Sequence, residues 1–253
     1  MRIVGMIPAR LNSTRFPGKV LALLGDRPLF WHVYHAAVSS GMFDAVYVAS
    51  GHESIREACG EYQIPCLTTG AGHQNPTSRI CEAAGQVDAD LYVMIGADEP
   101  LLTPADIKLV TEKAVTATTS PDAEDRPFVV NAMAAISSAP EVFDCANIKI
   151  VCSGSQKGLY ASRSPIPYPK GSLDYQYKKF VSIGVYTKEA LNFFDSTRKG
   201  LLEEIEEFDL LRFMEHGKTV LFAEIPGSTL SVDTPKDLER VREQFAAREN
   251  HSL

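Results

Sequence analysis

The sequence predicts an α/β protein with a mostly parallel sheet. Strand-like and helix-like segments alternate along the chain, which is typical of that class. The strand-like runs at residues 3–7 and 91–95 are continuously apolar, as in strands that are buried on both faces. With 253 residues and a hydrophobic fraction of 45%, the chain can bury a substantial core. We expect a single mixed α/β domain over residues 1–253, whose second half carries an insertion.

The first half of the chain alternates short strands with amphipathic helices. Apolar residues between Leu29 and Val38 recur at helical spacing, and Pro28 suits the first turn of that helix. Thr103 and Pro104 have the residue types of a helix cap and a first helical position. We expect strands at residues 3–7, 45–49, 64–67 and 91–95, and helices at residues 28–38, 52–62 and 76–84 and from residue 103.

The pattern changes after about residue 121. Three prolines within residues 162–169 lack N–H donors, so this segment is not the interior of a sheet. Thr234 and Asp237 have the spacing of a capping box before the last helix. We expect strands at residues 128–135, 148–151, 178–186 and 220–225, and helices at residues 188–194, 203–216 and 235–247.

Composition excludes several classes of protein. The net charge of −7 argues against general affinity for nucleic acid, which needs a basic surface. No apolar run approaches the ~18 residues that span a membrane, so no membrane partner is expected. The five cysteines are scattered and lack the close pairs of a zinc site. We expect free thiols in a soluble cytoplasmic protein.

A cationic loop follows the first expected strand. Arg10, Arg15 and Lys19 lie within ten residues, with Gly and Pro to bend the chain. The loop is not a P-loop, because Ser13 and Val20 replace residues that a P-loop requires, and no Gly-x-Gly-x-x-Gly motif follows the strand. A loop at the carboxyl end of a strand can bind a triphosphate. A solvated basic turn is the alternative.

Two acidic residues follow other expected strands. Asp98 comes directly after the strand at residues 91–95, and Asp233 lies between the last strand and the last helix. Carboxylates on separate connections can converge on Mg²⁺ that is bound to phosphates. Alternatively, Asp98 forms a turn and Asp233 serves only the helix N-terminus.

Three motifs taken together resemble one family. Pro8-Ala9-Arg10-x-x-Ser13-Thr14-Arg15-x-Pro17-Gly18-Lys19, Asp98-Glu99-Pro100 and Val232-Asp233-Thr234-Pro235-x-Asp237-Leu238 are similar to motifs of the sugar-acid cytidylyltransferases. The similarity is closest to the CMP-Kdo synthetases, also called 3-deoxy-manno-octulosonate cytidylyltransferases. Further matches follow in order along nearly the whole chain, at residues 72–79, 146–151, 159–167, 183–186 and 204–212.

This resemblance implies a fold, a reaction and a set of site residues. The implied fold is three-layered, Rossmann-like and of the nucleotide-diphospho-sugar transferase type. It carries an inserted subregion at roughly residues 148–186, through which the family forms homodimers. The implied reaction transfers CMP from CTP to a sugar acid and releases pyrophosphate, with Mg²⁺ as cofactor. By resemblance, the triphosphate is held by Arg10, Arg15 and Lys19, and Mg²⁺ is held by Asp98 and Asp233. The nucleotide is surrounded by Pro8, Ala9, Thr77 and Arg79. The residues that face the sugar acid are Arg163 and Tyr186.

The chain departs from this family at acceptor-side positions. Gly96-Ala97 replaces the usual Gln-Gly, Ser182 replaces the usual His, and Asp209-Leu210 replaces the usual Glu-Gln. Changed hydrogen-bonding groups at Gly96, Ser182 and Asp209 predict a changed acceptor preference. Another anionic acceptor, such as a nonulosonic acid or a phosphonate, is therefore an alternative to Kdo. A nucleotide-binding homologue without catalysis is a third alternative, which the intact basic and acidic residues disfavour.

Overall fold

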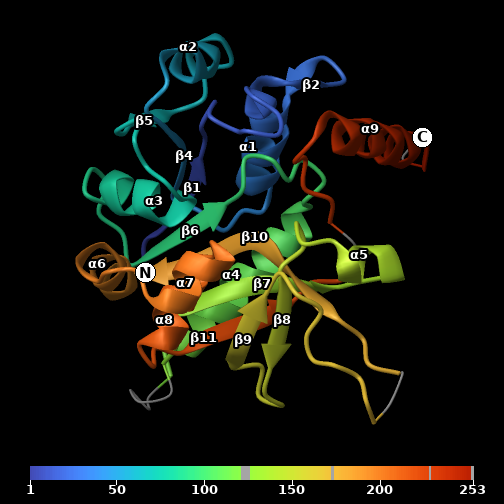
Figure 1. The fold of residues 1–253 in the computed structure, drawn as a ribbon. Helices are drawn as coiled ribbons and strands as arrows, with labels where there is room; N and C mark the ends of the chain where they lie inside the picture. The colour runs from blue at the N-terminus through green and yellow to red at the C-terminus, as the bar shows by residue number, and fades with distance from the viewer. Residues whose placement is uncertain (121–125, 172–173, 228, 252–253) are drawn as a thin grey trace. The chain divides into compact units, whose positions relative to one another are not determined.

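The computed structural model describes residues 1–120, 126–171, 174–227 and 229–251. The chain divides into two compact units, Met1–Ile107 with Thr229–Leu253 and Lys108–Ser228. Helix α4, Pro104–Thr118, carries the chain from the first unit into the second (Figure 1). The insertion expected at residues 148–186 lies within the second unit.

The first unit contains a parallel sheet. Its strands lie in the order β6, β1, β4, β5. Their bounds are Leu91–Ile95 (β6), Ile3–Pro8 (β1), Ala45–Ser50 (β4) and Cys66–Thr68 (β5). All three pairings are parallel, with Ile7 opposite Val48 and Met6 opposite Met94. The apolar runs thus form the buried centre of a parallel sheet, as the sequence predicts.

Three helices of the first unit cover the two faces of this sheet, namely α1 (Leu29–Ser39), α2 (Glu53–Glu61) and α3 (Pro76–Ala84). The unit also contains α9 (Pro235–His251). The chain passes from β1 to β4 to β5 in one direction and then returns to β6, so right-handed connections place α3 on the face opposite α1. Figure 1 shows α1 and α3 on opposite sides of β1 and β4.

The return of the chain to β6 creates a topological switch point between β1 and β6. Ligands of open α/β sheets bind outside the carboxyl ends of the strands at such a point. The connection after β1 contains the 3₁₀ helix η1 (Lys19–Leu21) and a small hairpin of β2 (Leu23–Leu24) and β3 (Arg27–Pro28). The switch point is therefore bordered by the cationic loop and by Asp98.

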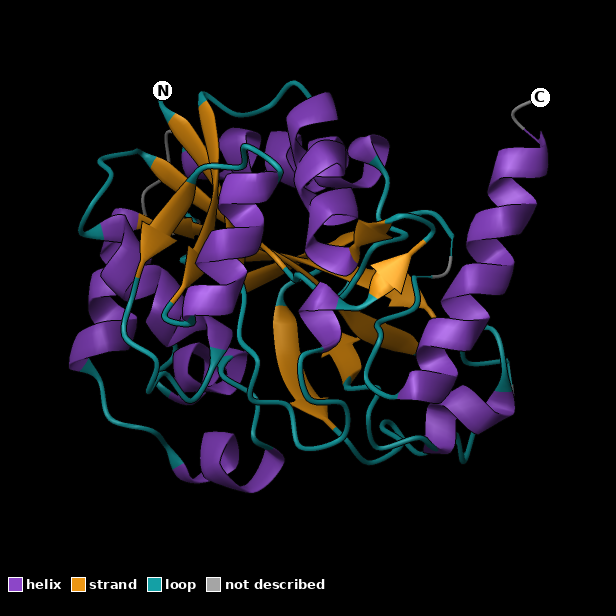
Figure 2. Cartoon of the chain, turned by 90° about the horizontal axis from the view of Figure 1, so that it is seen from above, coloured by secondary structure: helices purple, strands orange, loops and turns teal. Residues whose placement is uncertain are grey.

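An apolar cluster attaches this connection to α9, the long helix that ends the described chain (Figure 2). Its buried members are Leu24, Leu29, Leu101, Val232, Leu238 and Val241, and Phe16, Ala22, Leu230 and Phe245 pack against them. Phe16 and Val232 are the sequence neighbours of Arg15 and Asp233. Burial of these apolar side chains therefore fixes the backbone that carries both charged residues.

The second unit contains a mixed set of strands. β11 (Val220–Glu224) pairs parallel with β7 (Val129–Ala135), which pairs antiparallel with β10 (Lys178–Thr187). β8 (Lys149–Cys152) pairs antiparallel with both β10 and β9 (Gly158–Ser162). The helices of this unit are α5 (Ala139–Phe143), α6 (Lys188–Ser196), α7 (Leu201–Glu206) and α8 (Leu210–Glu215).

The structure corrects part of the expected secondary structure. The single helix expected at residues 203–216 is wrong, because Glu207 adopts the left-handed conformation (φ 48°) and ends α7 before α8 begins. The strand expected at residues 64–67 lies at Cys66–Thr68, because the N–H of Ile64 still bonds the helix carbonyl of Cys59. Strand β9, helix α5 and the β2–β3 hairpin were not expected. No described helix is long and apolar enough to cross a membrane.

Candidate active site

Hydrogen bonds within the cationic loop set its backbone conformation. The N–H groups of Ser13 and Gly18 both donate to the carbonyl of Leu11, at 2.8 and 2.9 Å. Gly18 has a φ of 71°, a conformation that glycine adopts without strain. The N–H of Phe16 donates to the hydroxyl of Ser13 at 3.4 Å. Helix η1 begins at Lys19, directly after this turn, and the side chain of Arg15 is about half-exposed.

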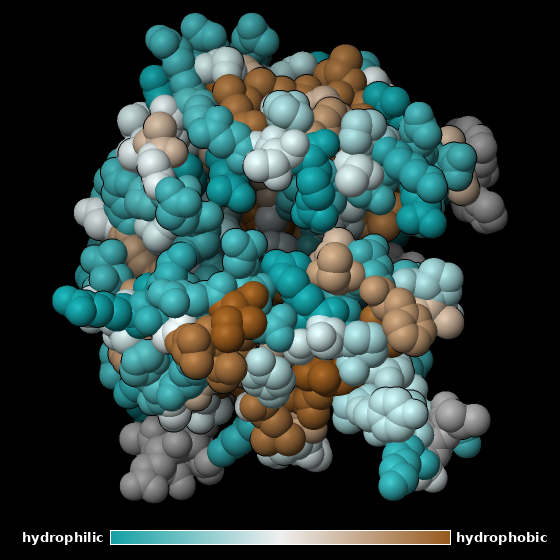
Figure 3. All heavy atoms as spheres, in the orientation of Figure 1, coloured by the Kyte–Doolittle hydropathy of each residue, from teal (hydrophilic) through white to brown (hydrophobic). Residues whose placement is uncertain are grey.

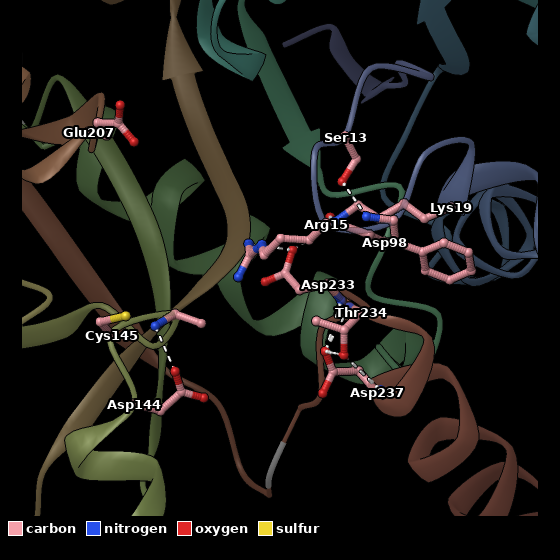
Figure 4. A network of polar contacts seen from close by, with 12 residues as sticks. Ser13, Arg15, Lys19, Asp98, Asp144, Cys145, Glu207, Asp233, Thr234 and Asp237 are labelled. Carbon is pink, nitrogen blue, oxygen red and sulfur yellow. Dashed lines mark hydrogen bonds and ion pairs between the residues drawn. The ribbon is translucent and has the colours of Figure 1, made fainter.

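Lys19 joins the two acidic residues that the sequence singles out. Its Nζ lies 2.5 Å from Oδ2 of Asp98 and 2.9 Å from Oδ1 of Asp233. Arg15 Nη2 lies 3.0 Å from the same oxygen of Asp233, and Figure 4 shows the two side chains pointing toward each other. The four residues come from three segments that are distant in the sequence. The structure therefore brings these four side chains together at the switch point, and their roles in binding phosphate and metal stay predictions.

The backbone holds the two carboxylates side by side. The N–H of Val232 donates to the carbonyl of Asp98 at 2.8 Å, which ties the connection after β6 to the segment before α9. The predicted capping box of α9 is confirmed. The N–H of Asp237 donates to Oγ1 of Thr234 at 3.3 Å, and Oδ2 of Asp237 accepts from the N–H of Thr234 at 2.8 Å (Figure 4).

Opposite charges shift the pKa values of Lys19 and Asp233. Burial alone would lower the pKa of Lys19, but the charges of Asp98 and Asp233 outweigh it, so that pKa is raised. Burial alone would raise the pKa of Asp233, but Lys19 and then Arg15 outweigh it, so that pKa is lowered. Both shifts favour the ionised forms of Lys19 and Asp233 at neutral pH.

The same carboxylates fit a divalent cation. Asp98 and Asp233 already converge on one cation, the ammonium of Lys19, and carboxylate oxygens are the ligands that Mg²⁺ prefers. No group of three or more His, Cys, Asp or Glu that could hold a metal occurs within the described part of the chain. The protein thus offers two carboxylates, which matches the way Mg²⁺ binds through one or two carboxylates and substrate phosphates.

Arg10 does not join the carboxylates. Its Nη1 donates to the carbonyl of Gln74 at 3.2 Å, in the loop that precedes α3.

Arg79 lies in α3 with 2% of its surface exposed. Its Nη1 donates to Thr69 Oγ1 at 2.6 Å and to the carbonyl of Gly70 at 2.9 Å. Its Nη2 is buried and has no hydrogen-bond partner among the described residues, so one donor pair of this guanidinium is available to a ligand.

The other predicted nucleotide contacts lie at the same edge of the sheet. Pro8 ends β1, and Thr77 is fully buried in the first turn of α3. Ala9 is also buried, and its N–H donates to the carbonyl of Ala49 at 2.9 Å. The N–H of Ala9 is therefore already used within the sheet, and a base would be bound by other groups.

Sequence reasoning did not identify the contacts of Glu82. Both carboxylate oxygens of Glu82 accept from the N–H of Gly70, at 3.1 and 2.9 Å, and one of them also bonds Nε2 of His73. Nδ1 of His73 lies 3.2 Å from Oγ of Ser78. These bonds hold the loop before α3, which supplies the Gln74 carbonyl to Arg10. The only sequence signal was the match at residues 72–79, because Glu82 itself reads as an ordinary helix residue.

The predicted acceptor-side residues lie mainly in the second unit. Arg163 donates through Nε to the carbonyl of Glu206 at 2.7 Å, through Nη1 to Cys145 at 2.9 Å and through Nη2 to Glu207 at 3.3 Å. The Glu206 carboxylate accepts from the N–H of Arg163 at 2.8 Å. The buried ammonium of Lys149 binds the carbonyl of Arg163. These hydrogen bonds therefore hold the Arg163 side chain in place and use three of its five guanidinium N–H groups. The other two could bind the acceptor substrate.

Tyr186 and the departure positions are less accessible. The ring of Tyr186 is fully buried, with its centroid 6.2 Å from that of Phe213. Ser182 lies in β10 at the irregularity between Val181 and Gly184. Asp209 precedes α8 and is partly buried, and in the first unit Gly96 is buried directly after β6. Direct contact of these residues with an acceptor stays a prediction.

The fold and the pairing of basic and acidic side chains at one sheet edge define a nucleotidyltransferase. The family model for cytidylyltransferases matches residues 4–220. The chain therefore belongs to the cytidylyltransferase family, as the resemblance predicts.

Similar proteins agree with this assignment. The 3-deoxy-manno-octulosonate cytidylyltransferase of Acidobacterium capsulatum is 35% identical over 250 residues, which are 98% of each chain. That of Escherichia coli is 30% identical over 97% of this chain and 96% of its own.

Solved structures agree as well. A structure of CMP:2-keto-3-deoxy-manno-octonic acid synthetase complexed with CTP has a TM-score of 0.89 and 30% identity, and covers 98% of this chain and 100% of its own. A cytidylyltransferase from Leptospira borgpetersenii, at 17% identity over 96% of this chain and 85% of its own, has a TM-score of 0.62 and shows the shared fold. The predicted α/β fold of the nucleotide-diphospho-sugar transferase type is thus confirmed.

Proposed function

We propose that this enzyme transfers CMP from CTP to a sugar acid, Kdo or a related 3-deoxy-ulosonic acid, and releases pyrophosphate for surface polysaccharide synthesis. The observation that carries the proposal is the bridging of Asp98 and Asp233 by Lys19, with Arg15 beside them, at the switch point of a parallel sheet. Similarity to proteins that are named for this reaction supports the substrate pair.

In the proposed reaction, the basic residues of the site bind the triphosphate and stabilise the leaving group. In the proposed reaction the acceptor hydroxyl oxygen forms a bond to the α-phosphorus of CTP, the bond from that phosphorus to the β-phosphate oxygen breaks, and the hydroxyl proton is lost to solvent. Arg10, Arg15 and Lys19 bind the triphosphate and neutralise the charge that grows on the leaving pyrophosphate. No covalent enzyme intermediate is required.

Asp98 and Asp233 would hold Mg²⁺, because their oxygens meet at one cation in the structure. When bound, Mg²⁺ supplies Lewis acidity that polarises the α-phosphate and favours ionisation of the acceptor hydroxyl. The two carboxylates keep their orientation through the Val232 to Asp98 backbone bond and the capping box of α9.

The nucleotide would bind along the loops after β1 and before α3. The buried guanidinium of Arg79, with its available Nη2, suits a carbonyl oxygen of the cytosine base. Pro8, Ala9 and Thr77 shape the same edge.

Arg163, Tyr186, Gly96, Ser182 and Asp209 are the proposed acceptor residues. Arg163 would bind the acceptor carboxylate through its remaining N–H groups.

A pyrophosphate-release assay tests the proposal. CTP is compared with ATP, GTP and UTP, each with Kdo and with several other sugar acids. We expect release with CTP, Mg²⁺ and at least one sugar acid, and a large loss of release when Mg²⁺ is chelated. Absence of CTP-dependent release with every acceptor would refute the proposal and favour a nucleotide-binding homologue without catalysis.

A second candidate is cytidylyl transfer to another anionic acceptor, such as a nonulosonic acid or a phosphonate. The departures at Gly96, Ser182 and Leu210 favour it, because the side chain of Leu210 has no hydrogen-bonding group to offer an acceptor. The same assay decides, because equal turnover of Kdo and the best rival acceptor would count against this candidate.

We also propose a homodimer formed through the segment at residues 148–186. Leu159, Tyr168 and Tyr175 are exposed large side chains of this segment, and Leu201 and Ile205 of α7 are exposed as well. Figure 3 shows hydrophobic side chains gathered around β9 and α7 of the second unit. Sedimentation velocity tests this, and Leu159→Asp should shift a dimer toward monomer. A monomeric wild type at working concentration would contradict it.

A further inference from the structure

The ammonium of Lys19 takes the position between Asp98 and Asp233 that a bridging divalent cation would need. Its Nζ contacts one oxygen of each carboxylate, at 2.5 and 2.9 Å, and only 12% of the Lys19 side chain is exposed. The two carboxylates are about one-quarter exposed. A metal ion cannot reach both of these oxygens while Lys19 stays between them, because the ammonium fills the space.

The charges of the site oppose metal binding in the same way. Asp98 and Asp233 contribute two negative charges, and Lys19 and Arg15 contribute two positive charges, so the four side chains sum to zero. A dication entering this neutral group would meet the charges of Lys19 and Arg15 at close range, where repulsion is strong. Removing the Lys19 charge would leave the group with a net charge of −1.

The triphosphate offers these cations a stronger partner. Phosphate oxygens form charge-assisted hydrogen bonds with Lys and Arg, and a triphosphate presents more charge than a carboxylate. Lys19 can change partners because its flexible four-carbon stem carries three donors. Arg15 can do so because 52% of its side chain is exposed. Movement of either cation onto phosphate would free oxygens of Asp98 and Asp233.

We propose that Lys19 closes the metal site in the nucleotide-free enzyme, so that a divalent cation binds well only after or together with the triphosphate. This inference rests on the proposed function, which makes the carboxylates a metal site. It assigns Lys19 a second role beside triphosphate binding, that of an internal competitor for the metal. The competition couples metal binding to nucleotide binding, and coupled sites affect each other equally in free energy.

Binding of Mn²⁺ to the nucleotide-free protein, followed by electron paramagnetic resonance, tests the proposal directly. We expect weak binding to the wild type and binding at least about tenfold tighter to Lys19→Met, which removes the charge and keeps the length. Adding Asp98→Asn to Lys19→Met should abolish the gain. Lys108→Met is the matched control, because Lys108 forms an ion pair with Glu112 on α4 and lies outside the four-residue site, so it should leave Mn²⁺ binding unchanged.

Equal or weaker Mn²⁺ binding by a folded Lys19→Met protein would overturn the proposal. A second comparison needs no change at Lys19. Asp98→Asn alone should barely alter Mn²⁺ binding without nucleotide, but should weaken it clearly with a non-hydrolysable CTP analogue. A similar loss in both conditions would mean that the site is open throughout, and would also overturn the proposal.

These measurements separate this inference from the proposed function. If no acceptor supports pyrophosphate release, the proposed transfer fails, whereas tighter Mn²⁺ binding by Lys19→Met would still establish that Lys19 competes for the carboxylates. If release occurs but Lys19→Met binds Mn²⁺ no better, the transfer stands and the competition fails.

Discussion

The main-chain N–H of Val232 donates a hydrogen bond to the carbonyl of Asp98 at 2.8 Å. This bond joins the connection after β6 to the segment before α9 and places Asp98 beside Asp233. It uses only backbone atoms, so the placement does not depend on the side chain of either aspartate. Loss of one carboxylate should therefore disturb the chemistry more than the fold.

Asp98→Asn should lower the rate of CTP-dependent pyrophosphate release about 100-fold or more, because it removes a charge that holds the metal. The melting temperature should stay close to that of the wild type, since Lys19 keeps its partner Asp233. Asp26→Asn is the control, because Asp26 is largely exposed and forms an ion pair with its neighbour Arg27 at 3.5 Å. Retained activity in Asp98→Asn would remove this residue from the site.

The cluster under α9 should contribute measurably to stability. Leu238→Ala should reduce the free energy of unfolding by about 2–4 kcal/mol, because it leaves a cavity beside Val232 and Val241. Urea denaturation measures the change. Glu239→Ala, one residue further along α9 and exposed, should have a much smaller effect. Equal effects of the two substitutions would contradict the packing described for this cluster.

A buried ion pair should be essential to the second unit. Arg212 Nε and Nη2 lie 2.6 and 2.7 Å from the two carboxylate oxygens of Glu203, with both side chains less than one-tenth exposed. Glu203→Gln should cost about 3–5 kcal/mol, because it leaves a buried guanidinium without its countercharge. Glu204→Gln, which is exposed on the same helix, serves as the control in the same denaturation experiment.

Stability should depend on pH through Glu82. Hydrogen bonds from His73 and then from the N–H of Gly70 hold the pKa of Glu82 below its ordinary value of 4.5. Since folding favours the carboxylate, this stabilisation is present above the unfolded pKa and is lost as the pH falls through the folded pKa.

Melting temperatures between about pH 3 and pH 7 test this expectation. The difference between wild type and Glu82→Gln should shrink as the pH falls. His73→Gln should remove the larger part of the effect, because His73 is its main cause. A difference that is constant with pH would show that Glu82 acts only through packing.

Gly51 should control the loop that holds Arg79. A Cβ at this position would lie 2.6 Å from backbone atoms of Gly70 and Ala71, and backbone cannot give way without moving the loop. Gly51→Ala should therefore raise the KM for CTP several-fold, because the carbonyl of Gly70 binds Arg79. Gly60→Ala is the matched control, because its Cβ meets nothing within 4 Å and should stabilise α2 by about 0.5–1 kcal/mol. An unchanged KM in Gly51→Ala would contradict this role.

Local patterns were enough to predict most elements of the fold. The helix at Pro76–Ala84 and the strand at Leu91–Ile95 lie where apolar periodicity and proline place them. The break at Glu207 escaped prediction, because a glutamate with positive φ leaves no residue-type signal, whereas glycine would. Strand β9 escaped because its pairing with β8 depends on contacts between segments rather than on its own composition.

The chemical groups of the site can be read from the amino-acid sequence. The residue types at Arg15, Lys19, Asp98 and Asp233 indicated phosphate and metal chemistry, since charge and ligand type belong to the side chains themselves. How these groups meet depends on the tertiary structure. It placed Lys19 between both carboxylates and bonded Arg10 to the carbonyl of Gln74 in the loop before α3, because strand order and the Val232 to Asp98 bond bring together segments that no local pattern relates.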